Sequence, residues 1–187
     1  MAEPDATILF DEAMIAARVD ALADALLRDV DNEWAAIALL QGALPFAADL
    51  MRALARRGVH PVLDCLWLES YRDARESSGR VVVRADISRS VEGRRALILD
   101  DIYDSGRTID FARAHIAAKG ALGTKVCAFV RKPSAPAGGV DLVGLEAPEA
   151  FLIGYGMDDA GRWRGLPYIA ALEHDPIILN RDHALDY

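Results

Sequence analysis

The fold of this chain is decided by the stretch Ala96-Leu97-Ile98-Leu99-Asp100-Asp101-Ile102-Tyr103-Asp104-Ser105-Gly106-Arg107-Thr108. Its four leading apolar residues are typical of a short buried strand, so Asp100 and Asp101 are expected where that strand ends. A helical pattern runs from Ile109 to Lys119 and closes at Gly120. Strand, turn and helix in this order predict an α/β fold, in which ligands bind at the carboxyl ends of the strands.

The turn from Ser105 to Thr108 has the features of a phosphate-binding segment. Gly106 can adopt backbone angles that other residues resist, which lets successive N–H groups point at one anion. The positive end of the following helix dipole adds to this attraction. The turn lacks the glycine patterns of nucleotide triphosphatases and of dinucleotide-binding folds. We therefore expect it to bind a single phosphate group.

Asp100 and Asp101 would repel a phosphate, so the pair indicates a different task. Neighbouring carboxylates accept hydrogen bonds from the vicinal hydroxyls of a ribose and help to hold Mg²⁺. A lone acidic pair is more often just the solvated end of a strand in an acidic protein. Combined with the phosphate-binding turn, however, the pair predicts a site for a ribose 5-phosphate.

Composition limits the class of protein. A chain of 187 residues, 52% of them hydrophobic, predicts one compact domain with a sizeable core. The net charge of −8 argues against a nonspecific nucleic-acid binder. No run approaches the roughly 20 apolar residues of a membrane span. Cys65 and Cys127 are expected to be reduced thiols in apolar strands, and together these features predict a cytoplasmic protein.

Strand and helix patterns alternate along most of the chain. Helices are expected to start at Asp11 and Pro45, each followed by apolar residues at helical spacing. Strands are expected near 8–10, 34–40, 61–69, 81–85 and 126–130. This alternation predicts a largely parallel sheet flanked by helices. Three further strand patterns at 141–145, 151–157 and 168–172 predict a small cap after residue 140.

A polar loop from 70 to 79 is too long for a tight hairpin. It is either a solvated connection or a mobile lid that closes over a substrate. Ser70 and Tyr71 lie at its base, where a lid would contact that substrate. A lid excludes water, which matters when water would capture the transition state.

Three side chains late in the sequence suit a flat heterocycle with carbonyl and N–H edges. Phe151 offers an aromatic face, Lys132 a cation and Asp158 a carboxylate. Arg164 follows them closely. Taken one at a time, these residues are more typical of a core aromatic, a turn and a surface cation.

The chain from about 11 to 172 resembles the hypoxanthine(-guanine) phosphoribosyltransferases of the type I phosphoribosyltransferase family. The central stretch resembles their motif for phosphoribosyl diphosphate (PRPP). The other similar segments are Leu44-Pro45-Phe46-Ala47-Ala48-Asp49-Leu50, Glu69-Ser70-Tyr71, Lys132-Pro133-Ser134, Phe151-Leu152-Ile153-Gly154-Tyr155-Gly156-Met157-Asp158 and Leu166-Pro167-Tyr168-Ile169. The resemblance implies a single domain over 1–187, with a core at about 11–139 and a hood at about 140–187 to which the N-terminus contributes.

The resemblance also implies a role for each similar residue on the PRPP side. Asp100 and Asp101 would bind the ribose hydroxyls and support Mg²⁺. The residues implied for the 5-phosphate are Ser105, Gly106, Arg107 and Thr108. Pyrophosphate would lie against Gln41, Gly42 and Arg164, and Ser70 and Tyr71 would form the lid.

On the purine side, the resemblance makes Asp104 the acid/base group at purine N7. Lys132 would contact the purine O6, and Phe151 would stack on the ring. The backbone near Leu152 would read the N1 and N2 edge, and Asp158 would meet the second Mg²⁺.

The chain departs from the family pattern at three places, one of which is the loop after Lys132, which is short. Many members have Leu-Lys-Gly-Gly in the pyrophosphate loop, where this chain has Leu40-Gln41-Gly42-Ala43 and loses a cation. The acidic pair is Asp-Asp where Glu-Asp is common, which shortens the reach of Asp100 by about one methylene. The loss of this cation affects pyrophosphate binding, and none of the three changes removes Asp104.

The implied reaction joins a 6-oxopurine to PRPP and gives IMP or GMP and pyrophosphate. One alternative is a non-enzymatic regulator of the same fold that senses PRPP or nucleotides. Another is an enzyme of the same class for a different base, such as xanthine or a pyrimidine. The partners implied are PRPP and a free purine base, in a homodimer or homotetramer, with neither nucleic acid nor membrane.

Overall fold

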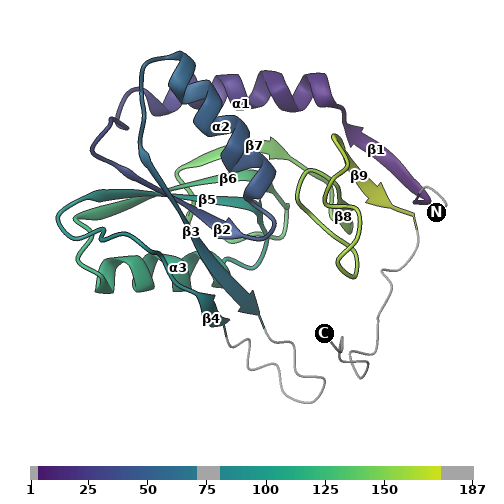
Figure 1. The fold of residues 1–187 in the computed structure, drawn as a ribbon. Coiled ribbons are helices and arrows are strands. Elements are labelled where there is room, and N and C mark those ends of the chain that lie inside the picture. The colour runs from purple at the N-terminus through teal and green to yellow at the C-terminus, as the bar shows by residue number, and fades with distance from the viewer. Residues whose placement is uncertain (1–3, 71–80, 174–187) are drawn as a thin grey trace, which may run out of the picture.

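The structure is a computed structural model that describes residues 4–70 and 81–173. These residues form three helices and nine strands (Figure 1). The helices are α1 (Glu12–Leu26), α2 (Leu44–Arg56) and α3 (Arg107–Ala118). The strands are β1 (Ala6–Phe10), β2 (Ala35–Leu40), β3 (Val62–Ser70), β4 (Val81–Ala85), β5 (Arg95–Tyr103), β6 (Gly123–Arg131), β7 (Leu142–Glu146), β8 (Leu152–Ile153) and β9 (Ile169–Leu172).

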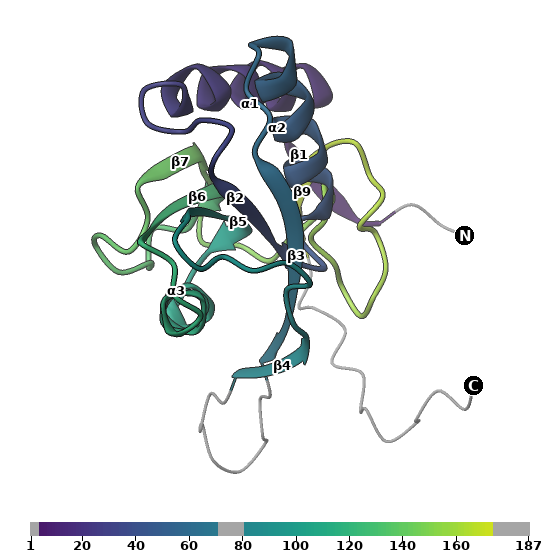
Figure 2. The same ribbon diagram turned by 60° about the vertical axis from the view of Figure 1, so that its left-hand side comes forward.

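The large sheet has six strands in the order β4-β3-β2-β5-β6-β7. All neighbouring pairs are parallel except that the edge strand β4 runs antiparallel to β3. Helices α1 and α2 cover one face of this sheet and α3 covers the other (Figure 1, Figure 2). The predicted sheet, largely parallel and flanked by helices, is therefore confirmed. The carboxyl ends of β2, β5 and β6 lie along one edge, where such sheets bind their ligands.

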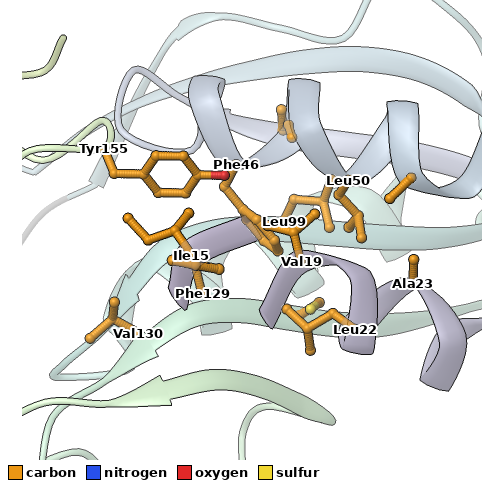
Figure 3. Packing of buried hydrophobic residues seen from close by; sticks show 14 of the residues in the cluster. Ile15, Val19, Leu22, Ala23, Phe46, Leu50, Leu99, Phe129, Val130 and Tyr155 are labelled. Atoms are coloured by element: carbon orange, nitrogen blue, oxygen red, sulfur yellow. The ribbon is translucent and has the colours of Figure 1, made fainter. Parts of the chain in front are cut away.

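Apolar side chains fill both faces of the large sheet. On one face, Leu22 of α1 and Leu50 of α2 pack in one cluster with Phe129 of β6 (Figure 3). On the other face, Ile109 and Ile116 of α3 belong to a second cluster. A parallel sheet that is covered on both sides loses its contact with water, which explains the uninterrupted apolar sequences of its central strands.

Local sequence signals explain where two of the helices begin. Asp11 caps α1, because its Oδ1 accepts a hydrogen bond of 2.8 Å from the backbone N–H of Met14. Pro45 lies in the first turn of α2, where its missing N–H costs nothing. Both helices were predicted to begin at these residues.

A smaller, antiparallel sheet in the order β1-β9-β8 joins segments from the two ends of the described chain. β1 pairs with β9 from Ala6↔Leu172 to Phe10↔Ile169. Beyond this ladder, the backbone N–H of Glu173 donates to the carbonyl of Asp5 at 3.2 Å. The strand predicted at 8–10 is thus an edge strand of the small sheet.

Two strand predictions were wrong in part. The pattern at 141–145 was assigned to the cap, but β7 runs parallel to β6 in the large sheet, where Leu145 joins the core cluster that α1 covers. The pattern at 151–157 yields only the two-residue strand β8. It stops there because Gly154 and Gly156 have φ angles of 91° and 103°, which turn the chain out of the ladder.

The two thiols of the chain form no disulfide, as expected. Burial raises the pKa of the Cys127 thiol to about 12, so this thiol stays protonated and unreactive at neutral pH. None of the helices found in residues 4–70 and 81–173 is both long enough and apolar enough to cross a membrane.

Candidate active site

The acidic pair lies inside β5 and not beyond its end as predicted. β5 continues because its later residues stay paired with β6, so that Asp100 is opposite Ala128 and Tyr103 is opposite Arg131. Asp100 is only 6% exposed. Its Oδ1 accepts a hydrogen bond of 3.1 Å from the backbone N–H of Asp101. The strand therefore fixes the backbone of both residues at the binding edge of the sheet.

Burial makes this pair costly to ionise. Burial, and next the nearby charge of Asp101, raises the pKa of Asp100 well above its ordinary value. Burial also raises the pKa of Asp101, while the charge of Arg164 acts to lower it. A cation beside two such carboxylates would remove most of the penalty, because it favours their charged forms. The donor set of this pair therefore fits a divalent metal ion.

A metal ion at the pair would need additional ligands. In the part of the chain that the structure describes, no three His, Cys, Asp or Glu side chains are placed to hold a metal ion together. Mg²⁺ is often bound by one or two carboxylates together with substrate phosphates and water. The geometry is thus suited to an ion that arrives with a phosphorylated substrate.

The predicted phosphate-binding turn has the expected backbone shape. Gly106 has a φ of 79° and precedes α3 directly, and its carbonyl accepts a hydrogen bond of 2.9 Å from the N–H of Asp110. The first N–H groups of a helix have no partner within the helix, so those after Gly106 can bind an anion. Of the predicted phosphate ligands, Ser105 and Arg107 are exposed and Thr108 is half-buried.

Asp104 and Lys132 leave the ends of two paired strands side by side. Because Tyr103 and Arg131 are in register, the next residue of each strand is brought next to the other, and the N–H of Lys132 donates to the carbonyl of Tyr103 at 3.0 Å. Lys132 Nζ lies 3.7 Å from Asp104 Oδ2 and also 3.7 Å from Glu149 Oε1. The structure thus brings together the predicted acid/base group and the predicted O6 ligand.

Asp158 and Arg164 form an ion pair within the turn that follows β8. Arg164 Nη2 lies 2.7 Å from Asp158 Oδ1, and Asp158 Oδ2 accepts a hydrogen bond of 2.7 Å from the N–H of Gly161. Arg164 Nη1 donates to the carbonyl of Gly156 at 2.6 Å. A carboxylate has about four acceptor positions, so Asp158 keeps some for a ligand or metal ion.

The loop 41–43 after β2 is wedged between the acidic pair and this turn. A Cβ atom at residue 42 would lie 2.0 Å from Asp101 Oδ2, and one at residue 156 would lie 1.8 Å from the carbonyl oxygen of Gly42. Only glycine fits at residue 156, where the contact is with backbone, whereas at residue 42 the Asp101 carboxylate would have to move. The Leu40-Gln41 peptide bond is cis, and the Gln41 residue is exposed while Gly42 is buried. All three predicted pyrophosphate ligands are therefore at or next to the acidic pair.

Phe151 and Leu152 lie where the small sheet begins. The carbonyl of Phe151 accepts a hydrogen bond of 3.0 Å from the N–H of Leu172, and the residue is 36% exposed. Leu152 is buried and pairs with Ala171. Since Glu149 reaches Lys132, the segment that leads to Phe151 starts beside the Asp104–Lys132 pair. An exposed ring in this position is available for stacking.

The predicted lid lies outside the described residues. Tyr71 and the rest of the loop up to residue 80 belong to the undescribed part, and of Ser70 only the backbone is described, at the end of β3. Their roles therefore stay predictions.

Sequence reasoning gave no role to a half-buried hydrogen bond between Tyr155 and Asp49. The hydroxyl of Tyr155 donates to Asp49 Oδ2 at 2.9 Å. The two residues are 106 positions apart, so no local pattern pairs them. The only signal in the sequence is a tyrosine between two glycines, Gly154 and Gly156.

Comparisons with known proteins agree on one family. The model of the phosphoribosyl transferase domain matches residues 5–159. The chain is 37% identical over 169 residues to the hypoxanthine-guanine phosphoribosyltransferase of Bacillus subtilis, a match that covers 89% of this chain and 92% of that protein. The structure is similar to a hypoxanthine phosphoribosyltransferase from Staphylococcus aureus, with a TM-score of 0.82 at 26% sequence identity. The match covers 90% of this chain and 92% of that one. The structure is also similar to the hypoxanthine phosphoribosyl transferase of Trypanosoma cruzi. The TM-score is 0.81 at 30% sequence identity, and the match covers 92% of this chain and 93% of that one.

Proposed function

This chain belongs to the phosphoribosyl transferase family, and on that basis we propose that it transfers the 5-phosphoribosyl group of PRPP to a 6-oxopurine. The substrates would be hypoxanthine and guanine, the products IMP or GMP and pyrophosphate, and the process purine salvage. The relatives at more than 30% identity that carry this activity in their names support the choice of substrate.

The observation that carries the proposal is the Asp104–Lys132 pair, 3.7 Å apart, next to the acidic pair and the phosphate-binding turn. A protein that only sensed PRPP would need the ribose and phosphate sites alone. A carboxylate and a lysine cation side by side can serve a heterocycle that loses a proton at one position and carries a carbonyl oxygen at another.

In the proposed reaction, the bond between ribose C1 and the pyrophosphate oxygen breaks and a bond from purine N9 to C1 forms. The proton that the purine loses at N7 passes to Asp104. Lys132 would donate to O6, which draws electron density from the ring and makes the N7 proton more acidic. Phe151 would stack on the ring and hold it in the plane that N9 needs for attack.

The remaining residues would hold PRPP and its leaving group. Asp100 and Asp101 would accept hydrogen bonds from the ribose hydroxyls, and the N–H groups from Ser105 to Thr108 would bind the 5-phosphate. Gly42 and Arg164 would face the pyrophosphate. Charge that develops on a departing pyrophosphate is best met by cations and dipoles already in place, which the ion-paired Arg164 provides.

We infer that the metal is Mg²⁺, with one ion supported by Asp100 and Asp101 and a second one met by Asp158. When bound, it would neutralise charge on the pyrophosphate group. The raised pKa values of the acidic pair support this assignment, because a cation lowers the cost of keeping both carboxylates charged. Assembly into a homodimer or homotetramer stays a prediction, which analytical ultracentrifugation would test. A cytoplasmic location also stays a prediction.

The test is a turnover assay with PRPP, Mg²⁺ and a panel of free bases: hypoxanthine, guanine, xanthine, adenine and uracil. We expect nucleoside 5′-monophosphate and an equal amount of pyrophosphate with hypoxanthine or guanine. Turnover with xanthine or uracil alone would show that the enzyme uses a different base as its substrate. Binding of PRPP without turnover of any base would instead favour a sensor of PRPP.

A further inference from the structure

The loop 41–43 has a third neighbour besides the acidic pair and the turn after β8. Helix α2 follows it directly, starting at Leu44, so any movement of α2 moves the loop. Asp49 lies on α2, one turn after Pro45. Its Oδ1 lies 2.8 Å from Arg52 Nη1 at the surface, and its Oδ2 accepts the hydrogen bond from Tyr155. Each oxygen of this carboxylate thus has a separate partner.

Tyr155 is fixed from three sides. Its backbone N–H donates to the carbonyl of Leu166 at 2.9 Å. Its ring packs on Phe129 with 4.9 Å between centroids, and Phe129 packs on Phe46 of α2 at the same distance (Figure 3). The residue is 6% exposed, and burial, then the hydrogen bond with Asp49, raises the pKa of its hydroxyl. The hydroxyl therefore stays protonated, and so remains a donor, at neutral pH.

The backbone of Tyr155 adopts an unusual conformation. Its φ is 47°, in the left-handed region that a non-glycine residue seldom occupies. Such a conformation persists only when surrounding contacts hold it. The ring packing and the bond to Asp49 provide those contacts, and they set the position of Gly156, whose Cα lies against the carbonyl of Gly42.

We propose that Tyr155 and Asp49 are positioning residues, which clamp the turn after β8 to α2 and so hold the loop 41–43 in the geometry that binds pyrophosphate. The inference rests on the proposed function. Neither residue is assigned to contact a substrate; they act through Gly42 and Gly156.

The clamp should affect binding at the loop 41–43 more than binding at the segment around Leu152. The segment around Leu152 is held independently, because β8 pairs with β9 in the small sheet. The loop 41–43 lies outside any strand ladder. Besides two short-range backbone hydrogen bonds, from Ala43 to Leu39 and from Leu44 to Gln41, it is held by the packing between α2 and the turn. Loss of the clamp is therefore expected to weaken pyrophosphate and PRPP more than hypoxanthine.

The experiment compares four variants of the full chain with the wild type. Calorimetry measures the affinity for Mg²⁺-pyrophosphate and Mg²⁺-PRPP, and steady-state kinetics gives the KM of PRPP and of hypoxanthine separately. We expect Tyr155→Phe and Asp49→Ala to weaken both diphosphates about three- to tenfold, as loss of one hydrogen bond implies, with the hypoxanthine KM within about twofold of wild type.

Two variants serve as matched controls. Asp49→Asn keeps an oxygen acceptor for the tyrosine hydroxyl, so we expect it to restore most of the affinity that Asp49→Ala loses. Arg52→Met breaks only the surface ion pair of the same carboxylate and is expected to leave both affinities unchanged.

The possible outcomes distinguish a failure of the clamp from a failure of the proposed function. Unchanged diphosphate affinity in Tyr155→Phe, with only a lower unfolding temperature, would make the bond purely structural and overturn the clamp. An equal loss for hypoxanthine and for pyrophosphate would also overturn it. If Tyr155→Phe does not fold, wild-type affinity in Asp49→Ala overturns the clamp in the same way. A wild-type chain that binds neither diphosphate would overturn the proposed function itself.

Discussion

The two halves of the candidate site are built differently. From Asp100 to Thr108, one continuous piece of strand, turn and helix carries the acidic pair, the acid/base candidate and the phosphate-binding turn. From Phe151 to Arg164, by contrast, the chain is shaped by segments more than a hundred residues away, through Gly42 and Asp49. Substitutions in the first half should therefore change chemistry and charge, and those in the second half should change geometry.

The largest effect is expected from Asp104→Asn, in the continuous half. Asparagine keeps the shape but cannot accept the purine proton, so turnover should fall by about 10²- to 10⁴-fold, the range for acid–base groups. The affinity for PRPP, measured by calorimetry, should change little because the phosphate and ribose sites remain.

Glu149→Gln is the matched control for Asp104→Asn. Glu149 Oε1 lies as far from Lys132 Nζ as Asp104 Oδ2 does, at 3.7 Å, but it lies outside the continuous half of the site. We expect turnover within about fivefold of wild type, well below the acid–base range. Equal losses in the two variants would show that both carboxylates act only by holding the lysine.

The double variant Asp100→Asn/Asp101→Asn tests the charge of the continuous half. With Mg²⁺ present, PRPP affinity should fall about 10- to 100-fold, because charged hydrogen-bond partners contribute about 1.5–3 kcal/mol. Without Mg²⁺ the loss should be smaller, because only the hydrogen bonds to the ribose hydroxyls are then weakened and the removed charges would otherwise repel the phosphates. Calorimetric titration in both conditions checks this, and equal losses in both would exclude a metal at the pair.

The same pair gives a pH-dependent effect on stability. Burial raises the pKa of Asp100 in the folded chain, so the folded state holds the proton more tightly than the unfolded state does. Stability is then lost as pH rises from about 3.9, the unfolded value, through the folded value. Asp100→Asn is expected to raise the unfolding temperature at pH 7.5 but not at pH 3. A lower unfolding temperature at pH 7.5 would contradict the burial penalty.

Gly156→Ala tests the geometry of the second half. The added Cβ would meet the carbonyl of Gly42 at 1.8 Å, and such overpacking costs about 1–3 kcal/mol. Gly161→Ala is the matched control, because Gly161 has a φ of 79° but nothing within 4 Å of its Cβ position. Denaturant titration should show the greater loss of unfolding free energy in Gly156→Ala. Equal losses would mean that backbone strain alone, without the contact to the loop, explains both.

The smallest effect is expected from Gln41→Lys, at the exposed side of the loop between the two halves. A cation in place of a neutral amide should tighten pyrophosphate by about 1 kcal/mol, roughly fivefold, and increase product inhibition. The inhibition constant of pyrophosphate measures this. Gln41→Met, which has a similar length and no charge, should give no gain. An unchanged constant in Gln41→Lys would place the side chain in solvent.

The sequence was informative where one short segment determines its own structure. The Gly106 turn, the start of α3 and the helix cap at Asp11 depend on neighbours within a few residues, and the structure has each of them. The strand was predicted to end at the acidic pair, whereas pairing with β6 carries β5 on to Tyr103. That pairing involves residues almost thirty positions away, which periodicity within one segment does not record.

The second half of the site was less predictable for the same reason. The pattern at 151–157 has the apolar residues of a strand, yet Gly154 and Gly156 end it after Ile153. The sequence pattern at 142–146 predicts a strand, but it does not distinguish a strand of the cap from a strand of the large sheet. Only the pairing of β7 with β6 assigns this strand to the large sheet, and the two paired strands are separated in the sequence by a loop.

The pairing of β1 with β9 has a consequence for the order in which the protein is made. β1 leaves the ribosome about 160 residues before its partner at Ile169–Leu172. Until then β1 is an unpaired edge, while β5, α3 and β6 already have their near neighbours. The phosphate-binding side of a nascent chain should therefore be structured before the purine side. Hydrogen exchange on chains stalled before residue 169 would measure this as protection of amides in β5, α3 and β6 but not in β1.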